Sequence, residues 1–440
     1  SDFKVLLRQS SHYLMGRGVA IAIGFVSFPI YARIFSVADY GILNLAQRFA
    51  LFAIAVSKLG LQNSILRFHP ETSSSEESLS RLYATSFYGS MLGALCGALL
   101  CASFFALAPA SWIQPNIARA LLVTSGLVFL RSVSSPIYSF LRVEGKTVAF
   151  NALDVLTRLF SLLIGVPLVL TLGRRPENLL TGLILAEALI IVIAIAFLIP
   201  RRRLALASFD PALLRSSLVF ALPLAGSELA QTLLGSADRA FVQYYLGSEP
   251  LGYYAAACAI AIILQEAVQI PLNLALVPIY MRIWHTEGAE ATSRCVSRTF
   301  DLFLLAACAM LGTVYAAADQ LIILVSSAKY GPAAPMLGPL VTGYLFLAAS
   351  VFLTAGYWVR KRTIEMARLV AIAFVFKCIL NVILLPRLGL WGAVIPNIAG
   401  FVLMTFLYGW FSRRLLPIEI SPSRILSYGV ATAMAGLIGS

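Results

Sequence analysis

Few charged residues lie inside the long apolar stretches of this sequence, and these are the positions at which it could do chemistry. In the first half of the chain they are five cations and two acids: Arg17, Arg48, Lys58, Arg131 and Arg158, with Asp154 and Glu187. In the second half they are one cation and two acids: Lys377, with Glu228 and Glu266. The balance is therefore +3 in the first half and −1 in the second.

This excess of cations among apolar residues favours the binding of an anion. A charge in hydrocarbon costs a few kcal/mol unless it has a partner or faces a water-filled cavity. Arginine binds phosphate oxygens bidentately, and several cations can share such a ligand. The first half therefore predicts a cationic cavity for an anionic ligand, whereas a cavity for organic cations would favour acids.

Some of the charges also have a structural interpretation. Asp154 and Arg158 are spaced i,i+4 and can neutralise one another on one helix. Arg17 and Lys58 are close enough to the ends of their stretches for the side chains to reach the lipid headgroups. Arg48 lies further from the headgroups, which favours the cavity for this residue.

Four charged residues lie near the centres of their apolar stretches: Arg131 in the first half, and Lys377, Glu228 and Glu266 in the second. We expect Arg131 and Lys377 to line a polar cavity. Buried carboxylates are candidates for proton or Na⁺ coupling, which makes Glu228 and Glu266 the acids of interest. The alternative is that one of these two acids forms a structural bridge with Lys377.

The elements that must position these charges are membrane-spanning helices. Sixty per cent of the 440 residues are apolar and only 12% are charged, about half the charged share of a soluble protein, and this excludes a soluble fold. Allowing about 20 residues for a span, we predict twelve, at residues 11–35, 41–66, 82–108, 117–141, 148–172, 178–199, 216–237, 251–281, 299–318, 335–357, 364–385 and 390–411. The last apolar piece, 425–440, is short for a span, and we interpret it as the start of a thirteenth helix.

The net charge of +13 is mostly a topology signal. With the N-terminus in the cytoplasm, the cytoplasmic connections hold 20 of the 33 cations and the outer connections hold 7, Arg239 among them. The positive-inside rule therefore predicts a cytoplasmic N-terminus. Two acids, Asp39 and Asp238, lie at span ends, where we expect water to reach them.

Several classes of function lack the residues that they need. No connection between spans is long enough for a nucleotide-binding or catalytic domain, and neither a phosphate-binding loop motif nor a zinc-protease motif is present. The six cysteines have no metal-type spacing. We therefore expect a transporter that is not an enzyme, without cofactor, metal or nucleic acid, and with the lipid bilayer as its surroundings.

Two segments of the chain repeat a similar pattern at an offset of 211 residues. Residues 30–41 and 241–252 each carry the end of a span, a short turn and a glycine before a new span. This offset divides the spans into two sets of six, a recurring plan of transporters. We expect an N-terminal lobe at 1–200, a basic cytoplasmic linker at 201–215, a C-terminal lobe at 216–412, and a loop with the start of a further helix at 413–440.

Short motifs over nearly the whole chain support a family resemblance. The first is 38–45, Ala-Asp-Tyr-Gly-Ile-Leu-Asn-Leu, and a second is 142–146, Arg-Val-Glu-Gly-Lys. The others are 58–61 with Arg67, Asp238, Gly247 with 252–254, 330–334 and 388–393. In these motifs the sequence resembles the polysaccharide flippases of the MATE-like (MOP) superfamily.

The resemblance implies an all-α polytopic membrane protein with two pseudo-symmetric six-helix bundles around a central cavity. It implies alternating access, a bacterial inner membrane, and movement of an undecaprenyl-pyrophosphate-linked oligosaccharide to the outer leaflet. It also implies that Arg17, Asp39 and Arg48 are cavity charges. We expect a monomer that works beside the polymerase and assembly proteins of a polysaccharide. The alternatives are a multidrug or solute antiporter of the same fold, and a membrane glycosyltransferase or ligase.

Overall fold

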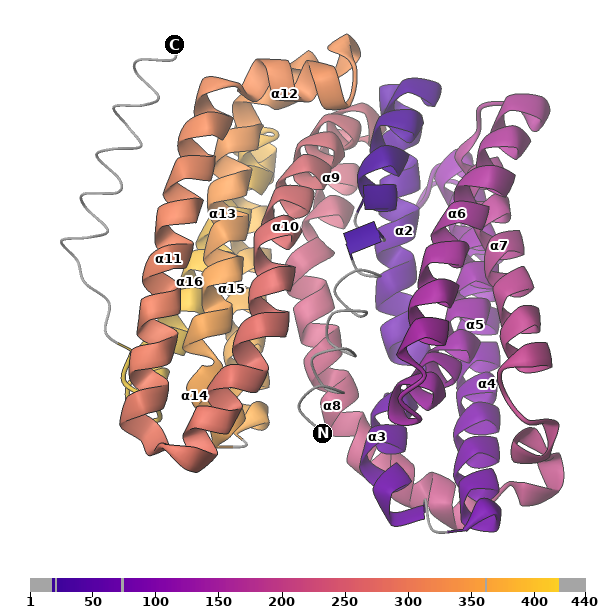
Figure 1. Cartoon of the computed structure of the whole chain (residues 1–440). Helices are drawn as coiled ribbons and strands as arrows, with labels where there is room; N and C mark the ends of the chain where they lie inside the picture. The colour runs from indigo at the N-terminus through magenta and orange to yellow at the C-terminus, as the bar shows by residue number, and fades with distance from the viewer. Residues whose placement is uncertain (1–17, 20–21, 73–74, 361, 419–440) are drawn as a thin grey trace. The chain divides into compact units, whose positions relative to one another are not determined.

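The computed structural model describes residues 18–19, 22–72, 75–360 and 362–418, which are helical and contain no strand (Figure 1). The helices are Ala22–Ile34, α2 Val37–Ser57, α3 Leu61–Thr72, α4 Glu76–Leu107, α5 Pro115–Val143, α6 Thr147–Leu172, α7 Pro176–Phe197, α8 Pro211–Ser236, α9 Asp238–Leu246, α10 Ser248–Thr286, α11 Gly288–Ala316, α12 Ala318–Val325, α13 Ala334–Leu353, α14 Ala355–Val359, α15 Thr363–Leu388 and α16 Trp391–Ser412. Short 3₁₀ helices are η1 Arg201–Leu204, η2 Leu206–Ser208 and η3 Ala328–Ala333.

Eleven helices in the described part of the chain are long and apolar enough to cross a membrane. They correspond to the second to twelfth predicted spans, so the prediction of a multi-pass membrane protein is confirmed. Of the first predicted span, 11–35, the longest helix that the structure describes is Ala22–Ile34. The predicted start of a thirteenth helix at 425–440 lies outside the described residues.

The second predicted span, 41–66, is broken into two helices. Leu59 and Gly60 between α2 and α3 both have positive φ, 53° and 69°. A left-handed residue other than glycine is costly, so packing must impose this turn. A Cβ on Gly60 would lie 2.6 Å from the carbonyl oxygen of Ala221. The break places Lys58 at the end of α2 rather than inside a continuous helix.

The chain forms two compact units, and the divisions fall inside helices. Unit 1 holds the described residues up to Ser27 and Ile42–Leu233, and unit 2 holds Phe28–Gly41 with the described residues from Leu234 onward. These bounds differ from the expected lobes, because most of α8 belongs to unit 1. The reason is packing of α8 on α3 and α4, in which Phe220 contacts Phe68 and Leu214 fills the space beside Gly89.

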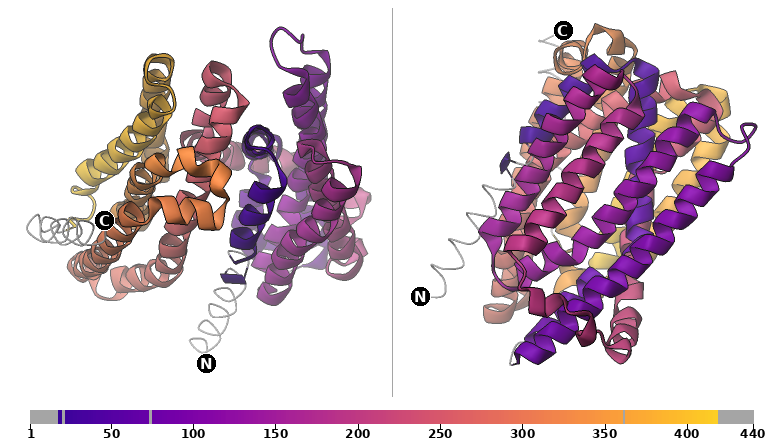
Figure 2. Two further views of the ribbon diagram at one scale, coloured as in Figure 1. Left: turned by 90° about the horizontal axis from the view of Figure 1, so that it is seen from above. Right: turned by 90° about the vertical axis from the view of Figure 1, so that its right-hand side faces the viewer.

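Each unit is a bundle of long helices (Figure 2). In unit 1, α4 packs on α5, α6 on α7, and α5 on α7. The core of this bundle includes Tyr83 stacked on Phe140, with ring centroids 3.9 Å apart. In unit 2, α16 packs on α13 and α15, and α10 packs on α13. The packed helices of each bundle position the charged side chains that the sequence places within spans.

Within unit 2, the two repeated segments contact one another reciprocally. A Cβ on Gly41 would collide with the carbonyl oxygen of Ser248, and a Cβ on Gly252 would collide with that of Val37. Val37 and Ser248 are separated by the offset of 211 residues, and so are Gly41 and Gly252. The repeat predicted from the sequence therefore has a structural counterpart, a close crossing of two helix N-termini that only glycine permits.

Candidate functional site

The first of three ion pairs that the predicted membrane charges form in unit 1 joins the break in the second span to α8. The Lys58 ammonium donates a hydrogen bond to Oε1 of Glu228, and Nε2 of Gln62 donates to Oε2 at 3.1 Å. Lys58 is mostly buried, so its interpretation as a headgroup-reaching side chain is wrong. The alternative in which Glu228 bridges to Lys377 is also wrong, because Glu228 lies on the part of α8 that packs in unit 1.

The second pair joins α5 to α7. Nε of Arg131 lies 3.5 Å from Oε2 of Glu187, and the Ser134 hydroxyl donates to Oε1 of the same carboxylate at 2.8 Å. The Arg131 side chain is 34% exposed, whereas Glu187 is only 4% exposed. A buried carboxylate therefore orients a guanidinium that remains accessible, and this guanidinium has further N–H donors for a ligand.

The third pair lies on α6, where Nε of Arg158 is 3.6 Å from Oδ1 of Asp154. This confirms the i,i+4 interpretation of the two residues. Both side chains stay partly exposed, Arg158 at 39%. An exposed pair of this kind is weak, so a stronger anionic ligand can compete with the carboxylate for the guanidinium.

The remaining predicted charges lie apart from these pairs. Arg48 is half-buried on α2, and Glu266 is half-buried on α10. Asp39 forms a reciprocal cap at the start of α2: its backbone N–H donates to the Ser36 hydroxyl at 3.0 Å, and this hydroxyl donates to Oδ2 of Asp39 at 2.6 Å. This arrangement is a form of capping box, which satisfies helix N-terminal groups. Arg17 lies outside the described residues.

Unit 2 holds a cluster of fully buried charges that the sequence did not predict. Asp238, expected at a wet span end, has no exposed surface, and neither has Arg239, which we had counted among the cations of the outer connections. Nη1 of Arg239 donates to Oδ1 of Asp238 at 3.0 Å. Both expectations are wrong, because the chain continues directly from α8 into α9 and packs these adjacent residues inside the bundle.

Lys377 joins the same cluster instead of lining a cavity. It is 1% exposed, its ammonium lies 3.5 Å from Oδ2 of Asp238, and it donates to the carbonyl oxygen of Leu234 at 2.8 Å. Asp238 also accepts hydrogen bonds from the hydroxyl of Tyr254 and, at 3.0 Å, from Nδ2 of Asn397. The expectation that Lys377 lines a polar cavity is therefore wrong for this structure.

The pairs change the charge balance that the sequence suggested. Because Glu228 packs with unit 1, the described membrane charges there are four cations, Arg48, Lys58, Arg131 and Arg158, and three acids, Asp154, Glu187 and Glu228. The excess of cations is kept, but it is smaller than the sequence predicted. The guanidinium groups of Arg131 and Arg158 are each held beside an acid.

Among the positions that the sequence analysis missed, one pair left a signal. Asp238 and Arg239 are adjacent opposite charges with neither glycine nor proline beside them, a pattern that suits a self-paired buried dipeptide as well as a loop. Gln62 gave no such signal, because the break at Leu59 and Gly60 separates it from the helix that ends before Lys58. No sequence signal linked Arg131 to Glu187, since they are on separate helices.

Comparisons with known proteins agree with this architecture. A family model described as "Polysaccharide biosynthesis protein" matches residues 6–284. An uncharacterized membrane protein of Methanocaldococcus jannaschii is 25% identical over 188 residues. The matched region covers 42% of this chain and 36% of that protein, so the chain spans about a third of the length of this curated relative.

Solved transporter structures share the fold over nearly the whole chain. The lipid II flippase MurJ in an inward closed conformation matches with a TM-score of 0.73 and 16% identity, over 97% of this chain and 91% of that chain. An inward-facing multidrug resistance MATE family transporter of the MOP superfamily matches with a TM-score of 0.67 and 15% identity, over 95% of both chains. These likenesses confirm the predicted all-α membrane fold.

Proposed function

Because the chain belongs to the polysaccharide biosynthesis protein family and has the fold of MOP-superfamily transporters, we propose that it is a flippase for a lipid-linked glycan. The substrate is an oligosaccharide on polyprenyl pyrophosphate, such as an undecaprenyl-linked repeat of an O-antigen or exopolysaccharide. Alternating access moves it from the cytoplasmic to the periplasmic leaflet of a bacterial inner membrane. The excess of cations in the connections predicted to be cytoplasmic supports a cytoplasmic N-terminus.

The observation that carries this proposal is the geometry of Arg131. Its guanidinium is accessible on a membrane helix, while its carboxylate partner Glu187 is buried and tied to Ser134. An arginine that is oriented before the ligand arrives loses less freedom on binding, and its planar fork matches phosphate oxygens. In our proposal Arg131, Arg158 and Arg48 bind the pyrophosphate, and the sugars occupy water-filled space beside them.

Substitution of Arg131 tests the proposal. We expect Arg131→Ala to abolish complementation of a flippase-deficient strain while the protein remains inserted and folded. Arg131→Lys keeps the charge but loses the fork, and we expect partial activity. Arg119→Ala is the matched control, since Arg119 is on the same helix, is 61% exposed and lies 3.7 Å from Glu177. Full activity of Arg131→Ala would refute the assignment of this residue.

A proton or Na⁺ gradient is the energy source that we propose, with Glu228 and Glu266 as the coupling acids. The support is that Glu228 is bound to Lys58 at the break between α2 and α3, where loss of the carboxylate charge would free a bent segment. Flipping is measured in vesicles with and without each gradient for Glu228→Gln and Glu266→Gln. If both variants respond to the gradients as the wild type does, these acids do not couple transport.

A same-fold antiporter is the second candidate function, favoured by the likeness to a multidrug transporter. Such a protein needs acids that face its cationic substrate, and the half-buried Glu266 has no hydrogen bond or ion pair among the described residues. Efflux of a cationic dye that depends on Glu266 but not on Arg131 would favour the antiporter. A membrane glycosyltransferase or ligase remains the enzymatic alternative, and turnover of a lipid-linked sugar by the purified protein would support it.

A further inference from the structure

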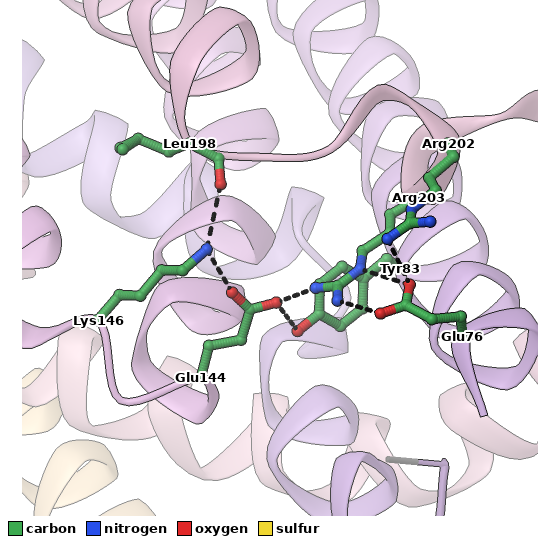
Figure 3. Close-up of polar contacts among 7 residues, drawn as sticks. All are labelled: Glu76, Tyr83, Glu144, Lys146, Leu198, Arg202 and Arg203. Atoms are coloured by element: carbon green, nitrogen blue, oxygen red, sulfur yellow. Dashed lines mark hydrogen bonds and ion pairs between the residues drawn. The ribbon is translucent and has the colours of Figure 1, made fainter. Parts of the chain in front are cut away.

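The motif 142–146, which the proposed site does not use, forms an anchor at the end of α5 (Figure 3). Both carboxylate oxygens of Glu144 have partners. Oε1 accepts a hydrogen bond from the Tyr83 hydroxyl at 2.8 Å and another from Arg203, while Oε2 lies 2.8 Å from the ammonium of Lys146. The Lys146 ammonium also donates to the carbonyl oxygen of Leu198, at the end of α7, at 3.4 Å.

Arg203 is the residue of the basic linker that this anchor holds. Its Nη2 and Nε donate to the two carboxylate oxygens of Glu76 at 2.9 and 3.3 Å, and Nη1 donates to Glu144. The guanidinium also lies over the ring of Tyr83, 5.4 Å from its centroid. Charge-assisted bonds of this kind are about twice as strong as neutral ones. Arg203 therefore ties the linker to both α4 and α5, whereas the side chain of the neighbouring Arg202 is 71% exposed and, among the described residues, makes only a 3.5 Å ion pair with Glu76.

The chain after Arg203 continues along α4. The hydroxyl of Tyr88 donates to the carbonyl oxygen of Leu204 at 2.8 Å, and the backbone N–H of Asp210 donates to the Thr85 hydroxyl at 3.0 Å. Oδ1 of Asp210 then accepts the backbone N–H groups of two residues in the first turn of α8, which caps this helix. The segment between α7 and α8 is thus bonded to unit 1 from its beginning to its end.

Helix α8 stays with unit 1 beyond the linker. Gly60 packs against Ala221, Lys58 binds Glu228, and unit 1 continues to Leu233. The residues after Leu233 belong to unit 2. A Cβ on Gly235 would meet no heavy atom within 4 Å, and α8 ends at Ser236. The change from unit 1 to unit 2 along this part of the chain therefore falls near the end of α8.

From these contacts we infer that Arg203 and Glu144 are positioning residues, which make the linker and α8 a rigid part of unit 1. The passage of the chain from unit 1 to unit 2 then falls after Leu233, and not in the linker. If the linker were flexible, α8 could move away from Lys58 even while Glu228 keeps its negative charge. The consequence for transport rests on the proposed function, whereas the rigidity of the linker does not.

Hydrogen exchange of the full-length protein in detergent tests the inference without any substrate. The reporters are the backbone N–H groups of Ala205, Ser208 and Phe209, which bond within the linker. We expect Arg203→Gln to accelerate their exchange by about tenfold or more, the factor expected when charge-assisted hydrogen bonds are lost. The matched control is Arg202→Gln, which removes an exposed neighbouring cation and leaves exchange within about twofold of the wild type. Unchanged exchange in Arg203→Gln would overturn the inference.

A transport assay separates positioning from a general loss of structure. For Arg203→Gln we expect a severalfold lower maximal flipping rate with an unchanged half-saturating substrate concentration, because the cations of the binding site are untouched. Arg203→Lys, which keeps the charge, should recover part of that rate. A higher half-saturating concentration at an unchanged maximal rate would overturn the positioning role and leave the proposed function standing. The exchange result decides the rigidity of the linker even if flipping is absent in the wild type.

Discussion

The charged side chains on the membrane helices differ in exposure between the two units. In unit 1 the ion pairs are partly exposed, as in Arg131 with Glu187 and Arg158 with Asp154. In unit 2 the charges of Asp238 and Arg239 have no exposed surface, and every oxygen of the Asp238 carboxylate has a partner. The same kinds of residue therefore serve as accessible groups in one bundle and as an internal crosslink in the other.

The difference shows that the role of a charged residue in a membrane protein depends on its partners, and not only on its depth in the membrane. A fully buried pair is expensive to desolvate, and removal of one partner leaves an uncompensated charge. A half-exposed pair can exchange its partner for a ligand at little cost. This contrast supports our proposal that unit 1 binds the ligand, whereas the buried charges of unit 2 hold its helices together.

The largest effect is expected for Asp238→Asn. This change leaves the buried cations Arg239 and Lys377 without their carboxylate, and we expect a loss of about 3–5 kcal/mol in stability. Thermal unfolding in detergent measures it. Asp154→Asn is the control from unit 1, since Asp154 is partly exposed, and we expect its unfolding temperature to stay close to that of the wild type. Equal effects of the two substitutions would remove the contrast between the units.

A smaller contrast is expected between the two lysines. Lys377→Met removes the side-chain donor to the backbone oxygen of Leu234 and a cation that lies 3.5 Å from Oδ2 of Asp238, at a cost of about 1–3 kcal/mol. In Lys58→Met the Glu228 carboxylate is accessible to water, so we expect less than about 1 kcal/mol. Unfolding in detergent again provides the comparison. A more damaging Lys58→Met would mean that the unit 1 pair is also a structural crosslink.

Transport should respond to Glu187→Gln more than stability does. The introduced amide would keep the contact with Ser134 but hold the Arg131 guanidinium less firmly, because it carries no charge. We expect the half-saturating concentration of substrate to rise by roughly threefold to tenfold, which corresponds to about 1 kcal/mol. Titration of the flipping rate with substrate measures the effect. An unchanged half-saturating concentration would argue that Glu187 does not prepare Arg131 for a ligand.

The smallest effect concerns pH and the anchor of the linker. Burial alone would raise the pKa of Glu144, but hydrogen bonds from Lys146 and Tyr83 outweigh it and hold the pKa below its ordinary value of 4.5. A carboxyl group with a lowered folded-state pKa stabilises the fold above the unfolded-state pKa and loses this contribution as pH falls through the folded-state value. Exchange of the linker amides, corrected for intrinsic rates, should therefore accelerate below pH 4.5. The same acceleration in Glu144→Gln would assign the pH dependence to another group.

Much of the architecture could be predicted, because a span depends on local composition. Eleven predicted spans have helical counterparts, and the offset of 211 residues led to the crossing of Gly41 and Gly252. The break at Leu59 was missed, since leucine rarely adopts a positive φ and its conformation here depends on packing.

The pairing of charges could not be predicted, because it depends on contacts between distant residues. Arg131 and Glu187 belong to different helices, and 59 residues separate Arg203 from Glu144. The place of Lys377 near the middle of its helix was predicted correctly, but its partner was not, since Asp238 was assigned to the aqueous end of a span. An apolar window gives the position of a charge along the membrane normal, but it contains no information about the neighbouring helices.

The cluster around Asp238 also has a consequence for biosynthesis. The chain is made from its N-terminus, and Lys377 follows Leu234 by 143 residues, so Asp238 and Arg239 must enter the membrane before α15 exists. Their adjacency makes this tolerable, because the two opposite charges can neutralise each other in the nascent chain. A ribosome that stops before α15 would leave the last bundle without its final cation. The bundle is completed only after α15, because Asn397 on α16 also donates a hydrogen bond to Asp238.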